Sequence, residues 1–293
     1  MIIQRQIMIS FGVNIYLILA LLFCILPISC SKQDISDTSY THEEIWLQEL
    51  TSSKYGGRKT GTNGCVMAKD YIIEELKKLG HTPNVQTFDF NESIIMNNII
   101  VDIPGDIDSV VIIGAHYDGA VSSELYQAAT DNASGVVALL SIAKSIGHSK
   151  YKTKLCFWDG EEFTNNSAFN GSRFFVNSSE DIHKIRWYCN LDCCGRSNDD
   201  IYLYYSQSIY DLCNDAYDLA SVNRKLDFNV LRKIQSNRSS DYVPFADAEI
   251  PFWGWNDCSA LSFVHTIDDN IGNVSISKIQ YVSSVTLSML QFL

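Results

Sequence analysis

Basic residues are scarce in this chain of 293 residues. It has 22 Lys and Arg against 34 Asp and Glu, which gives a formal net charge of −12 at pH 7. A protein that grips nucleic acid needs clustered Lys and Arg, so this balance argues against a nucleic-acid partner. Hydrophobic residues make up 46% of the chain, enough to build a globular core.

Internal repeats and low-complexity tracts are absent from the sequence. Once a leader is set aside, roughly 260 residues remain, which fits one large α/β domain. The sequence therefore favours a single folded domain over an array of small ones.

The cysteines show no regular CxxC spacing. Seven of them follow Cys30, at positions 65, 156, 189, 193, 194, 213 and 258. Because the number is odd, sequence alone cannot pair them, although one or two disulfides are expected in an oxidising compartment. The adjacent Cys193 and Cys194 lack the spacing of two to four residues that thiolate metal sites favour.

No apolar run is long enough for a typical membrane span, which needs about 20 residues. The run from 15 to 28 is shorter, and Arg5 precedes it, which is typical of a secretion signal. A single N-terminal anchor helix is the alternative. Residues 26–30 (Leu-Pro-Ile-Ser-Cys) resemble a bacterial lipobox, although Pro27 departs from the usual aliphatic residue.

These features predict three segments. Residues 1–30 form a signal peptide of the lipoprotein type, 31–43 a polar tether, and 44–293 the folded domain. We expect an exported protein in the periplasm or cell envelope, attached to a membrane through lipidated Cys30. Ordinary signal cleavage near this point is the alternative.

Helix-like and strand-like segments alternate along the domain. Helices are predicted at 62–79, 134–146, 209–220 and 276–293, and strands at 98–103, 110–114, 154–158, 185–191, 226–231 and 250–255. Asp106 is placed in the turn between the first two strands. This order predicts an α/β fold with a mostly parallel mixed central sheet and helices on both faces.

Polar side chains of the metal-binding kind follow these strands. His116 and Asp118 come after the second strand, Glu161 and Glu162 after the third, and Asp192 after the fourth. Ligands gather at the carboxyl ends of strands in such sheets, so we expect these side chains to converge.

Two further residues complete this set. Asp131 precedes the helix at 134, and His265 lies in a loop after the last strand. Each residue alone has an ordinary explanation; Asp131, for instance, would serve as a helix cap. Their coincidence predicts a metal site, because imidazole and carboxylate together suit Zn²⁺.

The ordered motifs closely resemble the clan of zinc aminopeptidases that also contains the glutaminyl cyclases. The matching motifs are Gly-Ala-His-Tyr-Asp at 114–118, Thr-Asp-Asn-Ala-Ser-Gly at 130–135, Asp-Gly-Glu-Glu at 159–162, Asn-Leu-Asp at 190–192 and His-Thr-x-x-Asp at 265–269. Segments 56–61, 170–173 and 240–245 support the resemblance, which runs from residue 44 to the C-terminus. Tyr242 departs from the pattern, since many members have His there. Because this position is not a metal ligand in the resemblance, the departure concerns the substrate pocket more than the metal site.

The resemblance implies two adjacent zinc sites that share one ligand, Asp131. His116 and Asp192 would serve one ion, and Glu162 and His265 the other. Glu161 is then the general base and acid. Asp118 is assigned as the second catalytic group, because a carboxylate beside a ligating His fixes its tautomer and raises its basicity.

Four functions remain open at this point. The favoured one is a zinc-dependent aminopeptidase acting on peptide substrates, with two zinc ions per chain. A glutaminyl cyclase with one zinc is the alternative; the ending at 265–270 resembles a cyclase, but Val264 replaces the Trp that usually precedes the last His. A carboxypeptidase or a non-catalytic binding lipoprotein is less favoured, and the latter predicts a lost ligand or a lost Glu161, which this chain does not show.

One aromatic-rich segment also invites an interpretation. Phe252, Trp253, Trp255 and Phe263 would line an apolar substrate pocket. The alternative is that alternate residues of this strand pack in the core, and we favour that for at least half of them.

Overall fold

The structure is a computed structural model that describes residues 40–91, 93–163, 168–222, 224–257 and 262–293. The predicted leader and residues 31–39 of the tether lie outside these ranges. Helix α2 (His42–Leu50) begins before the predicted domain boundary at residue 44. The reason is a reciprocal cap: Glu44 N donates to the Thr41 hydroxyl, and Thr41 N donates to the Glu44 carboxylate.

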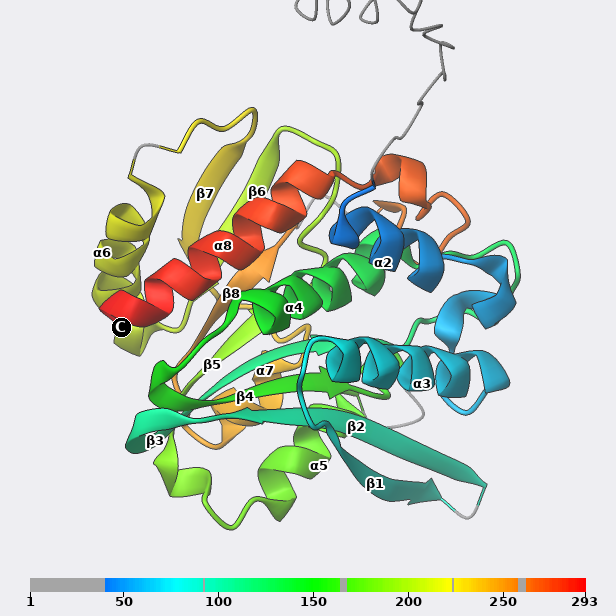
Figure 1. The fold of residues 1–293 in the computed structure, drawn as a ribbon, viewed down its shortest axis with the longest axis horizontal. Helices are drawn as coiled ribbons and strands as arrows, with labels where there is room; N and C mark the ends of the chain where they lie inside the picture. The colour runs from blue at the N-terminus through cyan, green and yellow to red at the C-terminus, as the bar shows by residue number, and fades with distance from the viewer. Residues whose placement is uncertain (1–39, 92, 164–167, 223, 258–261) are drawn as a thin grey trace, which may run out of the picture. The chain divides into compact units, whose positions relative to one another are not determined.

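One eight-stranded sheet forms the centre of the described chain (Figure 1), in the order β1-β2-β4-β3-β5-β8-β6-β7. The strands are β1 (Asn84–Asn91), β2 (Ile94–Ile103), β3 (Gly105–His116), β4 (Ser149–Trp158), β5 (Ile185–Leu191), β6 (Asp200–Tyr205), β7 (Asn229–Ile234) and β8 (Phe252–Asn256). Neighbours β4, β3, β5 and β8 run parallel, as do β6 and β7. The pairs β1–β2, β2–β4 and β6–β8 are antiparallel. The α/β class is confirmed, and the sheet is mixed, with its parallel part at the centre.

Helices cover both faces of this sheet (Figure 1). Besides α2 they are α3 (Asn63–Lys78), α4 (Ser134–Ser145), α5 (Asn170–Ser178), α6 (Tyr210–Ser221), α7 (Tyr242–Asp247) and α8 (Ile276–Phe292). The core below α2, α3, α4, α6 and α8 takes Val111 and Ile113 from β3, whereas the core below α5 and α7 takes Val110 and Ile112. Alternate residues of one strand thus serve the two faces.

Helix α4 departs from the expected amphipathic pattern. Its residues from Ser134 to Ala143 are all buried, because α2 and α8 cover it on the side away from the sheet (Figure 1). A helix enclosed on all sides has no polar face, so its three- and four-residue periodicity carries little information.

Several predicted elements are confirmed and others are corrected. The strand at 185–191 is found unchanged, and the helices at 62–79 and 276–293 differ by only a residue or so at their ends. Asp106 lies inside β3, not in a turn, and the strand predicted at 226–231 is shifted to β7. Strands β1 and β6 and the short helices α2, α5 and α7 were not predicted. Helix α7 has only six residues and contains Pro244, so it carries almost no periodic signal.

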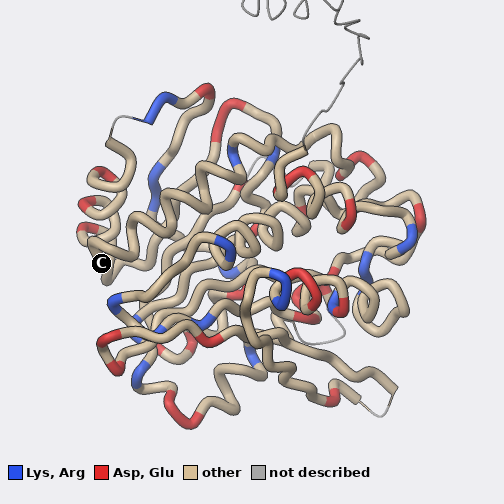
Figure 2. Tube along the Cα trace, viewed as in Figure 1, with Lys and Arg blue, Asp and Glu red and all other residues tan. Residues whose placement is uncertain are grey.

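Acidic and basic residues are interspersed along the described chain (Figure 2). Many of them meet in exposed ion pairs such as Lys77–Glu74, whose charged atoms lie 2.8 Å apart. Such pairs contribute little to stability in water.

The expected disulfides do not occur among the described cysteines. Cys65, Cys156, Cys189, Cys193, Cys194 and Cys213 are all free and buried, and Cys258 lies outside the described residues. Within the described ranges, every helix falls short of the length and apolarity that crossing a bilayer requires.

Candidate metal centre and active site

The carboxyl ends of three adjacent parallel strands carry most of the predicted site residues. Strand β3 ends at His116, β5 is followed directly by Asp192, and β4 is followed by the turn that contains Glu161 and Glu162. Gly160 in that turn has φ +75°, a conformation that glycine adopts at no steric cost. The three strands therefore bring these side chains to one edge of the sheet.

Asp131 lies between the two predicted histidine ligands. It belongs to the short helix η2 (Ala129–Ala133), which leads into α4. Its Oδ1 is 3.2 Å from Nε2 of His116, and its Oδ2 is 3.2 Å from Nε2 of His265. One carboxylate thus faces both imidazoles through different oxygens.

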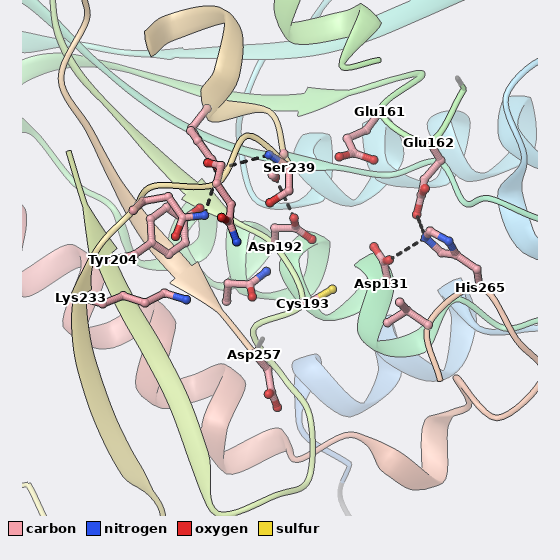
Figure 3. A pocket seen from close by; sticks show the side chains of 16 residues that line it. Asp131, Glu161, Glu162, Asp192, Cys193, Tyr204, Lys233, Ser239, Asp257 and His265 are labelled. Atoms are coloured by element: carbon pink, nitrogen blue, oxygen red, sulfur yellow. Dashed lines mark hydrogen bonds and ion pairs between the residues drawn. The ribbon is translucent and has the colours of Figure 1, made fainter. Parts of the chain in front are cut away.

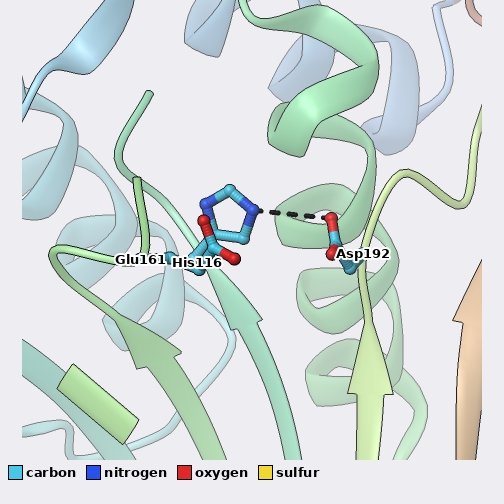
Figure 4. Close-up of side chains that lie close together, drawn as sticks. All are labelled: His116, Glu161 and Asp192. Carbon is cyan, nitrogen blue, oxygen red and sulfur yellow. Dashed lines mark ion pairs between the residues drawn. The ribbon is translucent and has the colours of Figure 1, made fainter. Parts of the chain in front are cut away.

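Each histidine also faces a second carboxylate. Nε2 of His265 is 2.8 Å from Oε1 of Glu162, a contact drawn in Figure 3. Nε2 of His116 is 3.5 Å from Oδ1 of Asp192, a contact drawn in Figure 4. The residues therefore form two neighbouring sets, His116 with Asp192 and His265 with Glu162, joined by Asp131.

The separations between these atoms suit zinc ligands. Ligand atoms held about 2.1 Å from a tetrahedral Zn²⁺ lie about 3.4 Å from one another. Three of the four observed separations, 3.2, 3.2 and 3.5 Å, are close to this value. In addition, Oδ1 of Asp192 is buried without a hydrogen-bond partner among the described residues. A buried carboxylate oxygen needs a partner, and a cation held by Asp192 and His116 would supply one.

The electrostatics of the cluster also call for positive charge. Burial, together with the charge of Asp131, raises the pKa of Glu162 to about 8. Burial raises the pKa of Glu161 well above its usual range; His116 opposes this rise and the other carboxylates add to it. Hydrogen bonds to Asp131 and Glu162 raise the pKa of His265 to about 10. Carboxylates crowded in this way are stabilised in their charged form by bound cations.

Asp118 holds the two strand ends together. Its Oδ1 and Oδ2 each accept a hydrogen bond of 3.1 Å, from the backbone N–H groups of Glu161 and Glu162 respectively. The same carboxylate lies 3.5 Å from Nδ1 of His116. The hydroxyl of Thr60, which the sequence analysis noted only as part of segment 56–61, is 3.1 Å from Oδ2. Asp118 therefore orients the histidine and the glutamate turn together.

Two further side chains position Asp131. The Asn132 amide donates to the carbonyl of Leu191 at 2.9 Å and accepts from Gly135 N at 3.0 Å, which ties the end of β5 to the start of α4. The peptide bond that precedes Asn132 is cis. Asp269 accepts from the N–H of Thr130 at 2.7 Å and from that of Asp131 at 3.0 Å. Because Asp269 follows His265 in one loop, it fixes the two sides of the site relative to each other.

Arg58 stabilises the backbone near Asp118 and Asp131. Its guanidinium is fully buried and donates to the carbonyls of Tyr117, Leu50, Gln127 and Ala128 at 2.7 to 2.9 Å. Three of these carbonyls, those of Tyr117, Gln127 and Ala128, flank the segments that carry Asp118 and Asp131. The segment 56–61 was noted only for its resemblance, and no local pattern in it signals these distant contacts.

A cavity of about 300 Å³ opens beside the cluster. Asp131, Glu161, Glu162, Asp192 and His265 line one end of it, and Tyr204, Lys233 and Ser239 lie toward the other (Figure 3). Cys193 and Tyr204 were not predicted to line it, although Cys193 directly follows a predicted ligand. The cavity is therefore large enough for a single substrate side chain next to the metal ligands.

Three of the four aromatic residues suggested for the pocket belong to the core instead. Trp253 and Trp255 pack in the larger core and Phe252 in the smaller one. Neither these three nor Phe263 is among the residues that line the cavity. Strand β8 is central in the sheet, so its side chains are buried between the helix layers.

All seven predicted site residues thus come together: His116, Asp118, Asp131, Glu161, Glu162, Asp192 and His265.

Comparison with known structures supports the fold. A zinc aminopeptidase from Bacillus subtilis is 16% identical, with a TM-score of 0.69, over 85% of this chain and 93% of that one. Glutaminyl cyclase from Porphyromonas gingivalis is 19% identical, with a TM-score of 0.71, over 84% and 96% of the two chains.

Comparison of sequences agrees with this comparison of structures. Leupeptin-inactivating enzyme 1 of Streptomyces exfoliatus is 27% identical over 216 residues, 71% of this chain and 46% of that protein. Leucine aminopeptidase 2 of Trichophyton rubrum is 32% identical over 189 residues, 63% of this chain and 34% of that protein. The chain thus aligns with less than half the length of these curated relatives. The model of peptidase family M28 matches residues 98–290, which include every predicted site residue, and the chain belongs to this family.

Proposed function

We propose that this protein is a zinc-dependent metallo-aminopeptidase that removes N-terminal residues from peptides. The observation that carries the proposal is the position of Asp131, whose two oxygens face His116 and His265 at 3.2 Å each. One carboxylate shared by two ligand sets is the arrangement of a site for two adjacent ions. Membership of a peptidase family and similarity to a leucine aminopeptidase support this reading.

The residues divide into two groups by what they contact. His116 and Asp192 would hold one zinc, Glu162 and His265 the other, and Asp131 both. When bound, zinc lowers the pKa of a water molecule to about 7 and polarises the scissile carbonyl. The protein's own part is to hold these ligands at one strand edge and to supply a proton acceptor beside them.

Glu161 fits the role of proton acceptor. Among the described residues, the other four carboxylates of the cluster each form an ion pair with a histidine, whereas Glu161 forms no ion pair. Figure 4 shows its carboxylate beside the ring of His116, with no contact drawn between them. It is buried and lines the cavity. Glu161 takes the proton from the attacking water and passes it to the amine that leaves.

A glutaminyl cyclase is the second candidate. The contact of 2.8 Å between His265 and Glu162, with Asp131 3.2 Å away, favours it, because these three residues alone make a compact single-zinc site. The fold likeness to a glutaminyl cyclase agrees with it. The aminopeptidase remains the better proposal, because His116 lies 3.2 Å from Asp131 and 3.5 Å from Asp192. These residues make a second ligand set, which a single-zinc site does not need.

Metal dependence tests the proposal. The full chain, purified in detergent, should release p-nitroaniline from leucine p-nitroanilide, lose this activity to a chelator, and regain it on addition of Zn²⁺. Activity that survives complete metal removal would rule out the mechanism. Export and lipid anchoring through Cys30 stay part of the proposal, and labelling with a radioactive fatty acid, absent in Cys30→Ala, tests them.

A further inference from the structure

The cavity wall opposite the metal ligands is an irregular segment, residues 235–239. It follows β7, and Gln235, Asn237 and Ser239 from it line the cavity. Figure 3 shows Ser239 across the pocket from Glu162 and His265. The described residues of this segment are partly or fully exposed and belong to no helix or strand. Something outside the segment must therefore hold it in place.

A single phenol fulfils this role. The hydroxyl of Tyr242 accepts a hydrogen bond from Nε2 of Gln235 at 2.9 Å and another from the N–H of Ser239 at 3.2 Å. It donates its own proton to the carbonyl of Asn237. The donor and acceptor capacity of the hydroxyl is thus filled by three points of one short segment.

The ring that carries this hydroxyl is itself fixed. Tyr242 is 2% exposed and is the first residue of helix α7. Its ring stacks on Phe252 of β8, with centroids 4.5 Å apart and planes at 18°, and lies near Tyr204 of β6 at 5.6 Å. The sheet and α7 therefore hold the phenol rigidly, and the phenol in turn holds the wall.

Other ties to the segment are few. The N–H of Gln235 donates to the carbonyl of Tyr205 at 2.9 Å, and Arg238 pairs with Asp247 on the surface. The first anchors only the start of the segment, and the second is exposed and so contributes little. The middle of the wall depends on Tyr242.

We propose that Tyr242 is a specificity-determining positioning residue. Through its hydroxyl it shapes the wall against which the side chain of the substrate's N-terminal residue lies. The inference rests on the proposed aminopeptidase function, because the metal end of the cavity then takes the α-amino group and the scissile amide. The rest of the cavity, bounded by residues 235–239, takes the side chain. The amide and hydroxyl groups of Gln235, Asn237 and Ser239 suit side chains that are long enough to reach them.

The variant Tyr242→Phe tests this, because it removes the hydroxyl and keeps the stacked ring. For leucine and glutamine p-nitroanilides, KM should rise about 5-fold, as expected for a lost hydrogen-bond anchor, with kcat unchanged. For alanine p-nitroanilide, whose side chain stops short of the wall, KM should change less than about 2-fold. The matched control is Tyr217→Phe, because Tyr217 is buried and bonds Tyr281 at 2.9 Å between α6 and α8. An equal loss for leucine and alanine substrates would overturn the proposal.

A second measurement does not depend on activity. Amide hydrogen exchange at Ser239, and tryptic cleavage after Arg238, should both be faster in Tyr242→Phe than in the wild type and in Tyr217→Phe. Unchanged exchange and cleavage would show that the hydroxyl does not hold the wall. If the wild type cleaves none of the p-nitroanilides, the proposed function fails, whereas the exchange result still decides whether Tyr242 orders the segment.

Discussion

Nε2 of His116 lies 3.2 Å from Oδ1 of Asp131. The other oxygen of the same carboxylate is at the same distance from His265. Asp131 is therefore the residue through which the two ligand sets meet. Neither set is complete without it, since each otherwise contains one histidine and one further carboxylate.

Asp131→Asn should weaken metal binding at both sites at once. The amide keeps the shape of the side chain but removes its charge and turns one oxygen into a donor. We expect the apparent affinity for both zinc ions to fall at least about 100-fold, more than the loss typical of a residue that only supports a ligand. Competition with a chromophoric chelator measures it. Loss of one ion with the other bound normally would show that Asp131 does not bridge.

Glu161→Gln and Glu162→Gln form a matched pair of neighbouring substitutions. Glu161→Gln should lower kcat by about 10² to 10⁴-fold, the contribution expected of a general base, and leave metal content unchanged. Glu162→Gln should lose one metal equivalent, because Glu162 faces His265 at 2.8 Å. Metal analysis and steady-state kinetics on both variants check this. An active Glu161→Gln enzyme would remove Glu161 from the mechanism.

Asp118→Asn should act through the residues that Asp118 positions. An amide in this place meets the N–H groups of Glu161 and Glu162 with one nitrogen where two oxygens now accept. We expect metal affinity to fall about 10- to 100-fold. Asp106→Asn is the control, since Asp106 is exposed and its one ion pair within the described ranges is with surface His148, at 2.7 Å. Equal affinity in the two variants would contradict the assigned role of Asp118.

Arg58→Lys should destabilise the fold without adding or removing charge. An ammonium group cannot reach all four carbonyls that the guanidinium fork serves, so buried acceptors are left without donors. We expect the free energy of unfolding to fall by about 3 kcal/mol in urea. Arg232→Lys is the surface control, because Arg232 pairs with exposed Asp218 at 2.8 Å, and it should change stability by less than about 0.5 kcal/mol. Similar values for both variants would contradict this role of Arg58.

Much of this site could be predicted from the sequence, because several ligand residues lie at the carboxyl ends of strands that local sequence patterns reveal. His116 ends β3, Asp192 directly follows β5, and Glu162 lies in the turn after β4. The apolar runs of these strands are visible in the sequence, and parallel strands bring their carboxyl ends to one edge. The pairing of Asp131 with two histidines, by contrast, came from the resemblance, because no spacing along the chain places residues 116, 131 and 265 together.

The parts that escaped prediction depend on distant contacts. Arg58 bonds backbone carbonyls up to 70 residues away, and backbone acceptors leave no trace in the sequence. Helix α4 was predicted at 134–146, but its burial from Ser134 to Ala143 was not, because that burial depends on α2 and α8, which are distant in the sequence. The wall at 235–239 is arranged by Tyr242, and only the departure from the family's usual His indicated that this position is special.

The most direct test of the central claim is the set of products formed from a defined peptide mixture. The full chain with Zn²⁺ is incubated with peptides that begin with Leu, Ala and Gln, and mass spectrometry follows the products. The account predicts stepwise loss of whole N-terminal residues, with two zinc ions bound per chain. Loss of ammonia from the Gln peptide alone, with one zinc bound, would instead identify a glutaminyl cyclase. Intact peptides in the presence of bound metal would contradict the proposed aminopeptidase.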